Sequence, residues 1–357
     1  MKLLLISNYQ HGIGGINAQV DLLYTYLNQE EGIMADIFST KGNPLRRCIA
    51  FLKLLCKVRR YDVLHIHACS YWGMIPAVMG VIAGKLWSKR IVITYHGGGA
   101  EEYFAKRTGF IRRWLGRADQ VVVLSGFLKD LFDHYDIPCV VIPNIVVLQP
   151  PIKRNTDIAP KFISIRHLEP LYNIPCILRA YGQVLQYYPE ATLDILGRGS
   201  QREELENYVA EKQLTGVRFV GQVPNQQIYD YLANADVMLS AAKADNMPVS
   251  LLEAMNAGLL VISSRVGGVP YMINEVKGNE NSAAETTASR LIASSPHRPN
   301  KATGLLFWSD NSDELAEKML WALEHPVEVK TIITNAQAEV QKYSWNNVKQ
   351  QLMKIYE

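Results

Sequence analysis

The sequence is poor in the residues that mark disulfide-rich, zinc-binding and membrane-spanning proteins. Its five cysteines are scattered and form no C-x-x-C pair: Cys48, Cys56, Cys69, Cys139 and Cys176. A disulfide framework or a zinc cluster is therefore not expected, and a reducing, cytoplasmic location fits this cysteine usage best. No uncharged apolar run of about 18 residues occurs, so no membrane span is expected.

The net charge is only +3, but the charges are unevenly distributed. Residues 1–150 hold 17 Lys and Arg against 11 Asp and Glu, whereas the remaining residues hold 20 against 23. Such an asymmetry indicates that the first half meets an anionic partner. We do not expect that partner to be a nucleic acid.

Short apolar runs alternate with longer amphipathic ones through both halves of the chain. This alternation is typical of right-handed βαβ units, in which helices cover both faces of a parallel sheet. In the first half we expect strands at Leu3–Ser7, Asp36–Ser39, Val63–His67, Arg90–Tyr95, Gln120–Leu124 and Val140–Ile142, with helices such as Ala18–Gln29 and Pro76–Lys85. In the second half we expect strands at Lys161–Ile165, Thr192–Leu196, Val217–Val220, Val237–Ser240 and Leu260–Ser263, with helices at Pro175–Tyr188, Glu203–Lys212, Gln226–Ala233, Pro248–Ala257 and Trp345–Tyr356.

The two series of elements are separated by residues 146–160, a stretch rich in proline and polar residues without periodicity. We interpret it as a linker between two Rossmann-like domains, 1–148 and 160–342, that face each other across a cleft. Ligands of such folds bind outside the carboxyl ends of the strands. Residues 274–303 are polar and rich in Ser, Ala and Asn, so we expect an exposed insertion there.

Two loops of the first domain follow strands and contain glycines. The loop YQHGIGGINAQ (Tyr9–Gln19) opens a helix, so its backbone N–H groups could approach a phosphate or a sugar. A dinucleotide fingerprint would need a third glycine where Asn17 stands, which disfavours a nicotinamide enzyme and leaves a plain tight turn as the alternative. In ITYHGGGAEEYF (Ile93–Phe104), His96 ends a strand beside three glycines, which favours a place in the cleft over a purely structural role.

In the second domain a positively charged residue, Arg166, also follows a strand. Arg166 emerges at the end of the domain's first strand, where a fixed guanidinium can meet a diphosphate. A plain surface arginine is the alternative.

The stretch DNMPVSLLEAMNAG (Asp245–Gly258) begins a helix and carries two acids. Pro248 suits the first helical turn, and the following amides, those of Val249, Ser250 and Leu251, would then be free to face an anion. Helix capping can account for Asp245, but it does not account for Glu253 inside an apolar run. A carboxylate at that place could accept hydrogen bonds from sugar hydroxyls.

Taken in order, these segments resemble the retaining glycosyltransferases of family 4, which have the GT-B fold. The matching segments cover nearly the whole chain: GIGGINAQ, DVLHIHA, ITYHGG, ADQVVVLS, VIPN, ILGRG, ADVMLS, DNMPVSLLEAMNAG, VISSRVGGVP and TGLLF. The resemblance implies a GT-B fold with two Rossmann-like domains: the first, 1–148, binds the acceptor and the second, 160–342, binds the nucleotide sugar. The closing helix, 343–357, crosses back to the first domain.

The resemblance also implies a role for each matching residue. Glu253 would bind the donor ribose, Arg166 would neutralise the donor diphosphate together with the helix amides, and His96 and Asp245 would contact the transferred sugar. The site residues implied are His96 and Asp245 as catalytic residues, and Gly14, Gly15, Arg166, Asn173, Pro248, Val249, Ser250, Leu251 and Glu253 as donor-binding residues.

Two positions depart from the family's pattern. The family's first glutamate is Asp245 here, one methylene shorter. The lysine and glycine that usually follow the arginine correspond to Tyr172 and Asn173, which removes one cation from the diphosphate site. Lys243, Arg265 or Arg198 could substitute for it.

Metal chemistry is not expected at this site. No D-x-D triplet occurs in the chain, and transferases that hold a nucleotide sugar through a metal commonly need such an acidic pair. His65 and His67 share one face of a strand and could bind a metal, but no third ligand is evident. We therefore expect no cofactor, only a nucleotide sugar as co-substrate.

The function implied is hexosyl transfer from a nucleotide-diphosphate sugar to a glycan or lipid-linked acceptor in surface polysaccharide or glycolipid biosynthesis. A nucleotide-sugar epimerase on the same fold and a non-catalytic nucleotide or sugar sensor are the alternatives. Residues 44–62 form a basic amphipathic segment that could lie on an anionic membrane surface, which would make the protein peripheral on the inner face of the plasma membrane. The same segment could instead pack on the sheet with a solvated basic face.

Overall fold

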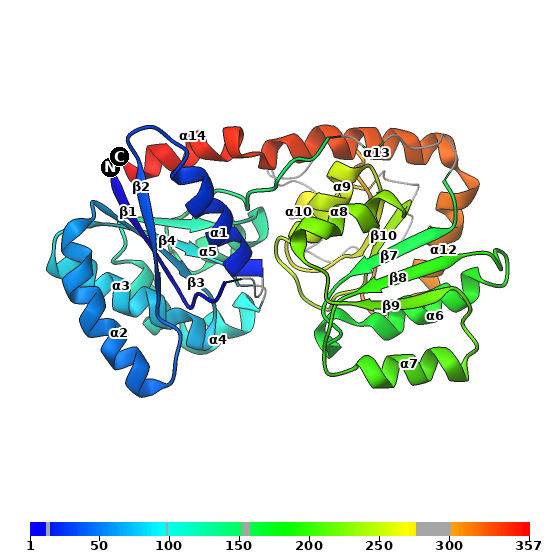
Figure 1. The fold of residues 1–357 in the computed structure, drawn as a ribbon, viewed down its shortest axis with the longest axis horizontal. Helices are drawn as coiled ribbons and strands as arrows, with labels where there is room; N and C mark the ends of the chain where they lie inside the picture. The colour runs from blue at the N-terminus through cyan, green and yellow to red at the C-terminus, as the bar shows by residue number, and fades with distance from the viewer. Residues whose placement is uncertain (12–14, 98, 151, 153–157, 276–300) are drawn as a thin grey trace. The chain divides into compact units, whose positions relative to one another are not determined.

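The computed structural model describes residues 1–11, 15–97, 99–150, 152, 158–275 and 301–357. The chain divides into two compact units, Met1–Ile145 with Tyr343–Glu357, and Val146–Lys342. Each unit holds one six-stranded parallel sheet flanked by helices (Figure 1), which confirms the predicted α/β class. None of the helices in the described ranges has the length and apolar character needed to cross a bilayer.

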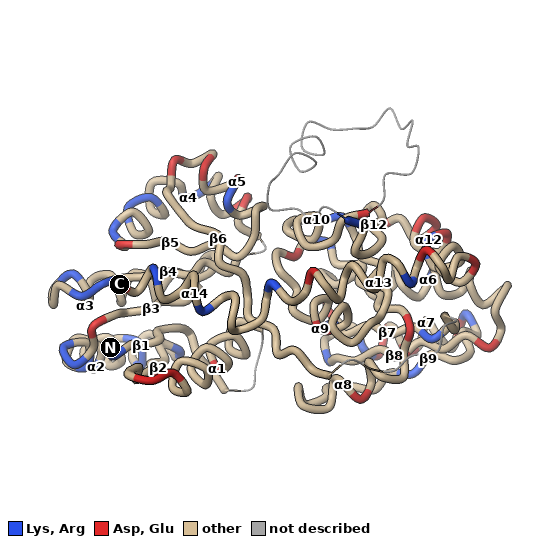
Figure 2. Tube along the Cα trace, turned by 90° about the horizontal axis from the view of Figure 1, so that it is seen from above, with Lys and Arg blue, Asp and Glu red and all other residues tan. Residues whose placement is uncertain are grey.

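The first unit alternates strands and helices as βαβ units do. Its strands pair in the order β2-β1-β3-β4-β5-β6. They are β1 (Lys2–Ser7), β2 (Met34–Ser39), β3 (Val63–Ala68), β4 (Arg90–Tyr95), β5 (Gln120–Val123) and β6 (Val140–Val141). Its helices are α1 (Gly15–Leu27), α2 (Pro44–Lys57), α3 (Ile75–Leu86), α4 (Ala100–Leu115), α5 (Gly126–His134) and α14 (Trp345–Tyr356). Lys and Arg gather along α2 (Figure 2).

Helices α4 and α5 were not identified from the sequence. In α4 the backbone leaves helical geometry at Arg107, with φ −138° and ψ 25°, and Gly109 follows in the same helix. The buried residues Tyr103, Ile111 and Leu115 nevertheless recur at helical spacing on both sides of this break.

Successive side chains of β1 enter two different cores, because strand residues alternate between faces. Leu4 and Ile6 pack into a cluster with residues of α2, α3, α4 and α5. Leu3 and Leu5 pack on the opposite face, into a cluster that includes residues of α1 and α14. The closing helix is therefore part of the first unit's core rather than an appendage.

Helix α14 is held in place by buried apolar residues and by polar contacts at both ends. Trp345 stacks on Tyr26 with ring centroids 5.2 Å apart, and its indole N–H donates to the Glu30 carboxylate over 2.8 Å. At the other end the Tyr356 hydroxyl lies 2.6 Å from His65 Nδ1. Leu352 is buried between these two anchors.

The second unit repeats the pattern, with strand order β12-β11-β10-β7-β8-β9. Its strands are β7 (Lys161–Ile165), β8 (Thr192–Leu196), β9 (Val217–Gly221), β10 (Val237–Ser240), β11 (Leu260–Ser264) and β12 (Leu305–Phe307). Its helices are α6 (Ile174–Val184), α7 (Arg202–Glu211), α8 (Asn225–Ala233), α9 (Val249–Ala257), α10 (Val269–Met272), α12 (Ser312–Glu324) and α13 (Pro326–Val340). Helices α12 and α13 were not among the expected elements.

Two irregular segments of the sequence are only partly described. The described residues of 146–160 form neither a helix nor a strand before β7. Most of the expected insertion, 276–300, lies outside the described residues. Its two ends are joined, because the Thr303 amide donates to the Asn274 carbonyl over 2.8 Å and the Asn274 amide donates to Thr303 Oγ1 over 3.0 Å.

Substitution of Leu352 tests whether α14 is part of the core. Leu352→Ala removes a buried side chain from the cluster shared with α1 and the sheet, and should lower the free energy of unfolding by about 2–4 kcal/mol. Lys354→Ala, at an exposed position of the same helix, should change it by less than about 0.5 kcal/mol. Urea denaturation followed by circular dichroism measures both. Equal stability of the two variants would contradict this account of α14.

Candidate functional site

Arg166 is the central cation at the carboxyl edge of the second sheet. It follows β7 directly, and its side chain is 9% exposed. Its Nε donates to Ser240 Oγ at the end of β10 over 3.2 Å, and its Nη2 lies 3.3 Å from a carboxylate oxygen of Asp245. The Tyr172 ring lies 5.8 Å from the guanidinium carbon. Arg166 is therefore a fixed, mostly buried cation rather than a flexible surface arginine.

Asp245 belongs to a loop that packs tightly against the glycine pair after β11. Gly267 has φ +47°, and a Cβ added there would lie 2.0 Å from the Asp245 carbonyl oxygen. A Cβ on Gly268 would lie equally close to the Asn246 carbonyl oxygen. The pair Gly267–Gly268 thus lets two loops approach each other and holds Asp245 beside Arg166.

Helix α9 begins one residue later than expected, and one of the three amides expected to be free is already bonded. Pro248 is the residue before the helix rather than in its first turn, and its carbonyl accepts from the Leu251 amide over 3.1 Å. The Leu251 amide is therefore already used. Among the described groups no acceptor is found for the amides of Val249 and Ser250, and the buried Ser250 hydroxyl has no partner either. The donors left for an anion are these two amides and this hydroxyl.

Glu253 lies one turn further along α9, half-buried. Burial raises the pKa of its carboxyl group to about 7, although the attraction of Arg166 acts in the opposite direction. Arg166 pairs with Asp245, and its attraction does not offset the desolvation of Glu253. A ligand that hydrogen-bonds to the ionised carboxylate would relieve this cost.

Asn173 has the left-handed backbone conformation, with φ 52° and ψ 44°, before α6. This conformation explains how an asparagine can stand where the family has a glycine. The buried Asn173 side chain donates to Asp310 over 2.7 Å. Lys243 lies next to the same turn: its amide donates to the Leu171 carbonyl over 2.8 Å, and its ammonium lies 3.3 Å from Asp310.

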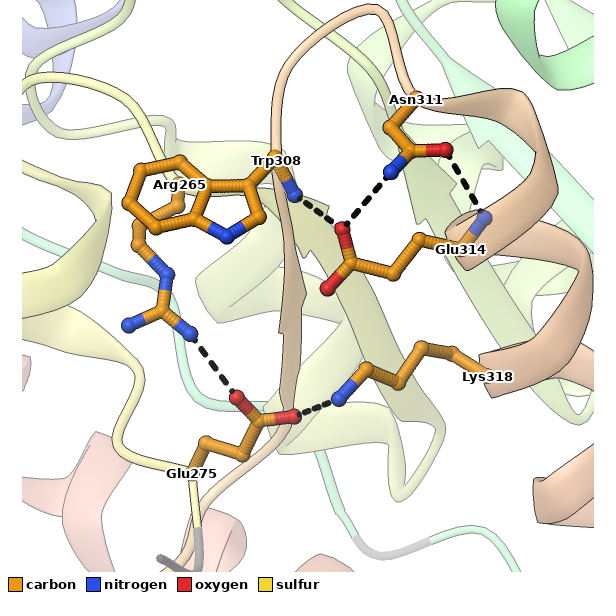
Figure 3. A network of polar contacts seen from close by, with 6 residues as sticks. All are labelled: Arg265, Glu275, Trp308, Asn311, Glu314 and Lys318. Carbon is orange, nitrogen blue, oxygen red and sulfur yellow. Dashed lines mark hydrogen bonds and ion pairs between the residues drawn. The ribbon is translucent and has the colours of Figure 1, made fainter. Parts of the chain in front are cut away.

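The other two cations considered from the sequence are differently placed. Arg265 forms an ion pair with Glu275 at 3.1 Å and lies over the Trp308 ring, while Lys318 binds the other oxygen of Glu275 (Figure 3). This network holds Arg265 beside Glu275 and Trp308, although no hydrogen-bond partner is found for its Nε among the described residues. Arg198 lies beside the loop after β7, where its carbonyl accepts from the Leu168 amide over 3.0 Å. Lys243 is thus the cation tied to the turn that holds Tyr172 and Asn173.

The first unit gathers three histidines, two on β3 and one directly after β4. The amide of His96, directly after β4, donates to the Ala68 carbonyl over 2.8 Å. His96 Nε2 lies 2.9 Å from His67 Nδ1, and the rings of His65 and His67 stack with centroids 4.6 Å apart. Gly15, at the first position of α1, is described, whereas Gly14 lies outside the described residues.

Burial keeps these three imidazoles neutral. It lowers the pKa of His65 to about 3 and the pKa of His96 to about 4, and it lowers the pKa of His67 well below the ordinary value. Both ring nitrogens of His65 already have partners, the hydroxyls of Tyr356 and Thr94. His65 therefore has no nitrogen left for a metal, and no group of three or more His, Cys, Asp or Glu able to hold a metal is present among the described residues.

Sequence reasoning missed the partners that fix these side chains. Ser240, which accepts from Arg166, and Tyr356, which reaches His65, come from segments far away along the chain. Nothing local signals either contact. For Ser240 the sequence offered one indication, its position at the end of a predicted strand. The structure pairs that strand, β10, with β7, the strand that Arg166 follows.

The raised pKa of Glu253 predicts a dependence of stability on pH. A carboxyl group with an ordinary pKa of 4.5 when unfolded and about 7 when folded stabilises the fold below pH 4.5, and this contribution is lost as the pH rises to about 7 and above. Glu253→Gln remains neutral, so at pH 8 it should be more stable than the parent chain by about 1–3 kcal/mol. At pH 4 the two should be equal.

Glu206→Gln, on α7 of the same unit, is the matched control and should change stability by less than about 0.5 kcal/mol at either pH. Thermal or urea unfolding at the two pH values gives the comparison. A Glu253→Gln variant no more stable than the parent at pH 8 would show that the carboxyl is not desolvated.

The two halves of the chain match models of glycosyltransferases. The model described as Glycosyl transferases group 1 matches residues 150–339, more than half of the chain. The model described as Glycosyltransferase Family 4 matches residues 21–149.

Two proteins that are named as glycosyltransferases are similar in sequence to this chain. The D-inositol 3-phosphate glycosyltransferase of Corynebacterium diphtheriae is 25% identical over 61% of this chain, and the match spans 58% of that relative. The phosphatidyl-myo-inositol mannosyltransferase of Mycolicibacterium smegmatis is 25% identical over 83% of this chain and 71% of its own length.

A solved structure has the same fold over its whole length. The structure of Anabaena HepE in complex with UDP has a TM-score of 0.73 with 18% identity, and the match covers 99% of each chain. This likeness confirms the predicted GT-B fold. Together with the match to more than half of the sequence, it completes the assignment: the chain belongs to the Glycosyl transferases group 1 family, the family 4 type of glycosyltransferase with the GT-B fold.

Proposed function

We propose that this chain moves a sugar from a nucleotide-diphosphate sugar to a glycan or lipid-linked acceptor, with retention of configuration and without a metal. The observation that carries the proposal is the gathering of Arg166, Asp245, Glu253 and the open amides of α9 at one edge of the second sheet. Relatives named as glycosyltransferases and a similar fold solved with UDP support it.

The diphosphate would bind where positive charge and free donors meet. The Arg166 guanidinium and the amides of Val249 and Ser250 can stabilise the negative charge that develops when the bond between the sugar and the diphosphate breaks. The acceptor oxygen forms the new bond to the sugar carbon, and its proton passes to the departing diphosphate oxygen. No protein nucleophile is required by this scheme.

The other residues would position the donor. Glu253 would accept hydrogen bonds from the ribose hydroxyls, which compensate for its burial. Asp245 and neutral His96 would contact the transferred sugar by hydrogen bonding, since an imidazole with a pKa of about 4 carries no charge near neutral pH. Lys243 would supply the cation that Tyr172 does not.

Substitution at the two central residues tests this site. Arg166→Ala and Glu253→Ala should each lower turnover by about a hundredfold or more, because each removes a charged contact to the donor. Arg218→Ala, which breaks an exposed ion pair with Asp194 in the same unit, should leave turnover within about twofold. EDTA should have no effect. The measurement is sugar release or transfer from a panel of UDP, GDP and ADP sugars.

Product analysis separates the proposal from its rivals. An epimerase would convert the donor without any acceptor, and a sensor would bind the nucleotide sugar without consuming it. Full turnover in either the Arg166 or the Glu253 variant would refute the assignment of the site, and loss of turnover in EDTA would refute the metal-independent scheme.

Helix α2 supports an acceptor at a lipid surface. It packs on the unit through buried Leu54, yet Leu45, Ile49 and Leu52 remain 70%, 45% and 64% exposed. Their spacing of four and three residues places them on one face of the helix. Exposed Arg46 and Lys53 lie beside them in the sequence.

This combination favours a membrane over the alternative of a solvated basic face. A solvated face has no need of three exposed apolar side chains in a row, whereas an interfacial helix needs both an apolar stripe and basic neighbours. We infer that α2 rests on an anionic membrane, on the cytoplasmic side, where a lipid-linked acceptor would be reached.

Sedimentation with vesicles tests this inference. The parent chain should sediment with vesicles that contain phosphatidylglycerol at low salt, and less at moderate salt, because the charges are screened. The double variants Leu45→Ser/Leu52→Ser and Arg46→Glu/Lys53→Glu should each bind at least about tenfold more weakly. Val327→Ser, at a 76% exposed position of the second unit, should bind like the parent. No binding of the parent at low salt would refute the inference.

A further inference from the structure

Two histidines of the first unit, His67 and His96, meet through their ring nitrogens. His67 Nδ1 lies 2.9 Å from His96 Nε2, whereas the ring centroids are 5.1 Å apart. The sheet brings the two rings together: His67 lies opposite Thr94 on the neighbouring strand, and His96 follows Thr94 two residues later on the same face. The proposed sugar transfer gives His96 a role but leaves His67 without one.

His67 is the more firmly held of the two. It is 5% exposed, it lies within β3, and its ring stacks on that of His65. His65 is itself fixed at both ring nitrogens, by the hydroxyls of Tyr356 and Thr94. His96 is only half-buried and lies beyond the end of its strand, followed by glycine. The fixed ring of His67 can therefore set the orientation of the less confined ring.

The position of the hydrogens follows from the other nitrogen of His67. Both rings are neutral, because burial lowers the pKa of each, so each ring carries one N–H. If His96 donated from Nε2, the N–H of His67 would stand at its buried Nε2, for which no partner is found among the described residues. If His67 donates from Nδ1, its Nε2 is a bare acceptor instead. Buried N–H groups without an acceptor are rarer in proteins than acceptors without a donor, which favours the second arrangement.

We propose that His67 is a positioning residue for His96: it donates from Nδ1 to His96 Nε2 and so keeps the hydrogen of His96 on Nδ1. The bond made by one imidazole nitrogen decides which nitrogen carries the hydrogen. His96 Nδ1 has no partner in the part of the chain that the structure describes, so its N–H is available to an acceptor oxygen of the transferred sugar. This last step rests on the proposed function, whereas the hydrogen bond between the two rings does not.

Three substitutions separate this role from a merely structural one. His67→Asn keeps an N–H donor close to the position of Nδ1, whereas His67→Leu keeps the bulk and removes the donor. Thr94→Val is the matched contrast, because it deletes a buried hydroxyl that is bonded to His65. It should melt at a lower temperature than the parent chain, because it leaves a nitrogen of His65 without that partner, and yet leave the hydrogen of His96 where it is.

Nitrogen NMR of the full chain with ¹⁵N-labelled histidine is the test, because the shift of each ring nitrogen shows whether it carries a hydrogen. In the ligand-free parent chain, His67 and His96 should both be protonated on Nδ1 and bare on Nε2. Their signals are assigned by their loss in His67→Asn and in His96→Gln. In His67→Leu the ring of His96 should no longer show the Nδ1–H form alone, and in His67→Asn it should keep the form of the parent.

Turnover of the nucleotide sugar gives the second measurement. His67→Leu should lower it by about tenfold, the effect of one hydrogen bond that orients a reacting partner. His67→Asn should stay within about threefold of the parent chain. His134→Asn, at an exposed position of α5 in the same unit, is the control: it should leave both turnover and the signals of His96 unchanged.

Each other outcome overturns the proposal. These outcomes are a hydrogen on Nε2 of His96 in the parent chain, no change of His96 in His67→Leu, an equal change in Thr94→Val, or a His67→Asn variant that behaves like His67→Leu. Equal turnover of His67→Leu and an active parent chain would also overturn it. Failure of the proposed function is seen separately: a parent chain with the expected NMR signals that transfers no sugar would refute the transfer and leave the hydrogen bond between the two histidines established.

Discussion

The balance of charge around Arg166 is the main constraint in the second unit. Its mostly buried guanidinium has two acids near it, Asp245 and Glu253, and of these two Asp245 forms the ion pair. Glu253 is left in a desolvated position, and its pKa rises to about 7 as a result. Charge in a medium of low dielectric constant must be balanced locally, so an acid that is buried without an ion pair favours its neutral form. An anionic ligand at Arg166 would enter this balance and change it.

Much of the fold could be predicted from the sequence, because alternating apolar runs and helical periodicity are local signals. The strands that end at Ser7, Tyr95 and Ser240 were placed at the residues where the structure ends them. The helices were found less completely, because α4, α5, α12 and α13 were not among the elements named from the sequence.

The site could be predicted in its parts but not in its contacts. The positions of Arg166 and Glu253 followed from their places after a strand and inside a helix. The pairing of Arg166 with Asp245, the use of the Leu251 amide by Pro248 and the bond from Asn173 to Asp310 depend on how loops meet in space. Sequence spacing carries no information about such contacts. The predicted role of Gly14 falls outside the described residues.

Helix α14 has a consequence for the order in which the chain can fold. The core on one face of the first sheet needs Val348, Leu352 and Tyr356, which come more than two hundred residues after the last strand of that sheet. The second unit, Val146–Lys342, contains all of its own strands and helices and requires none of α14. During synthesis from the amino end, the unit that begins first is therefore completed last. Until Tyr356 has emerged from the ribosome, the apolar face made by Leu3, Leu5 and Val92 has no complete cover, and this face is where a nascent chain would need protection from aggregation.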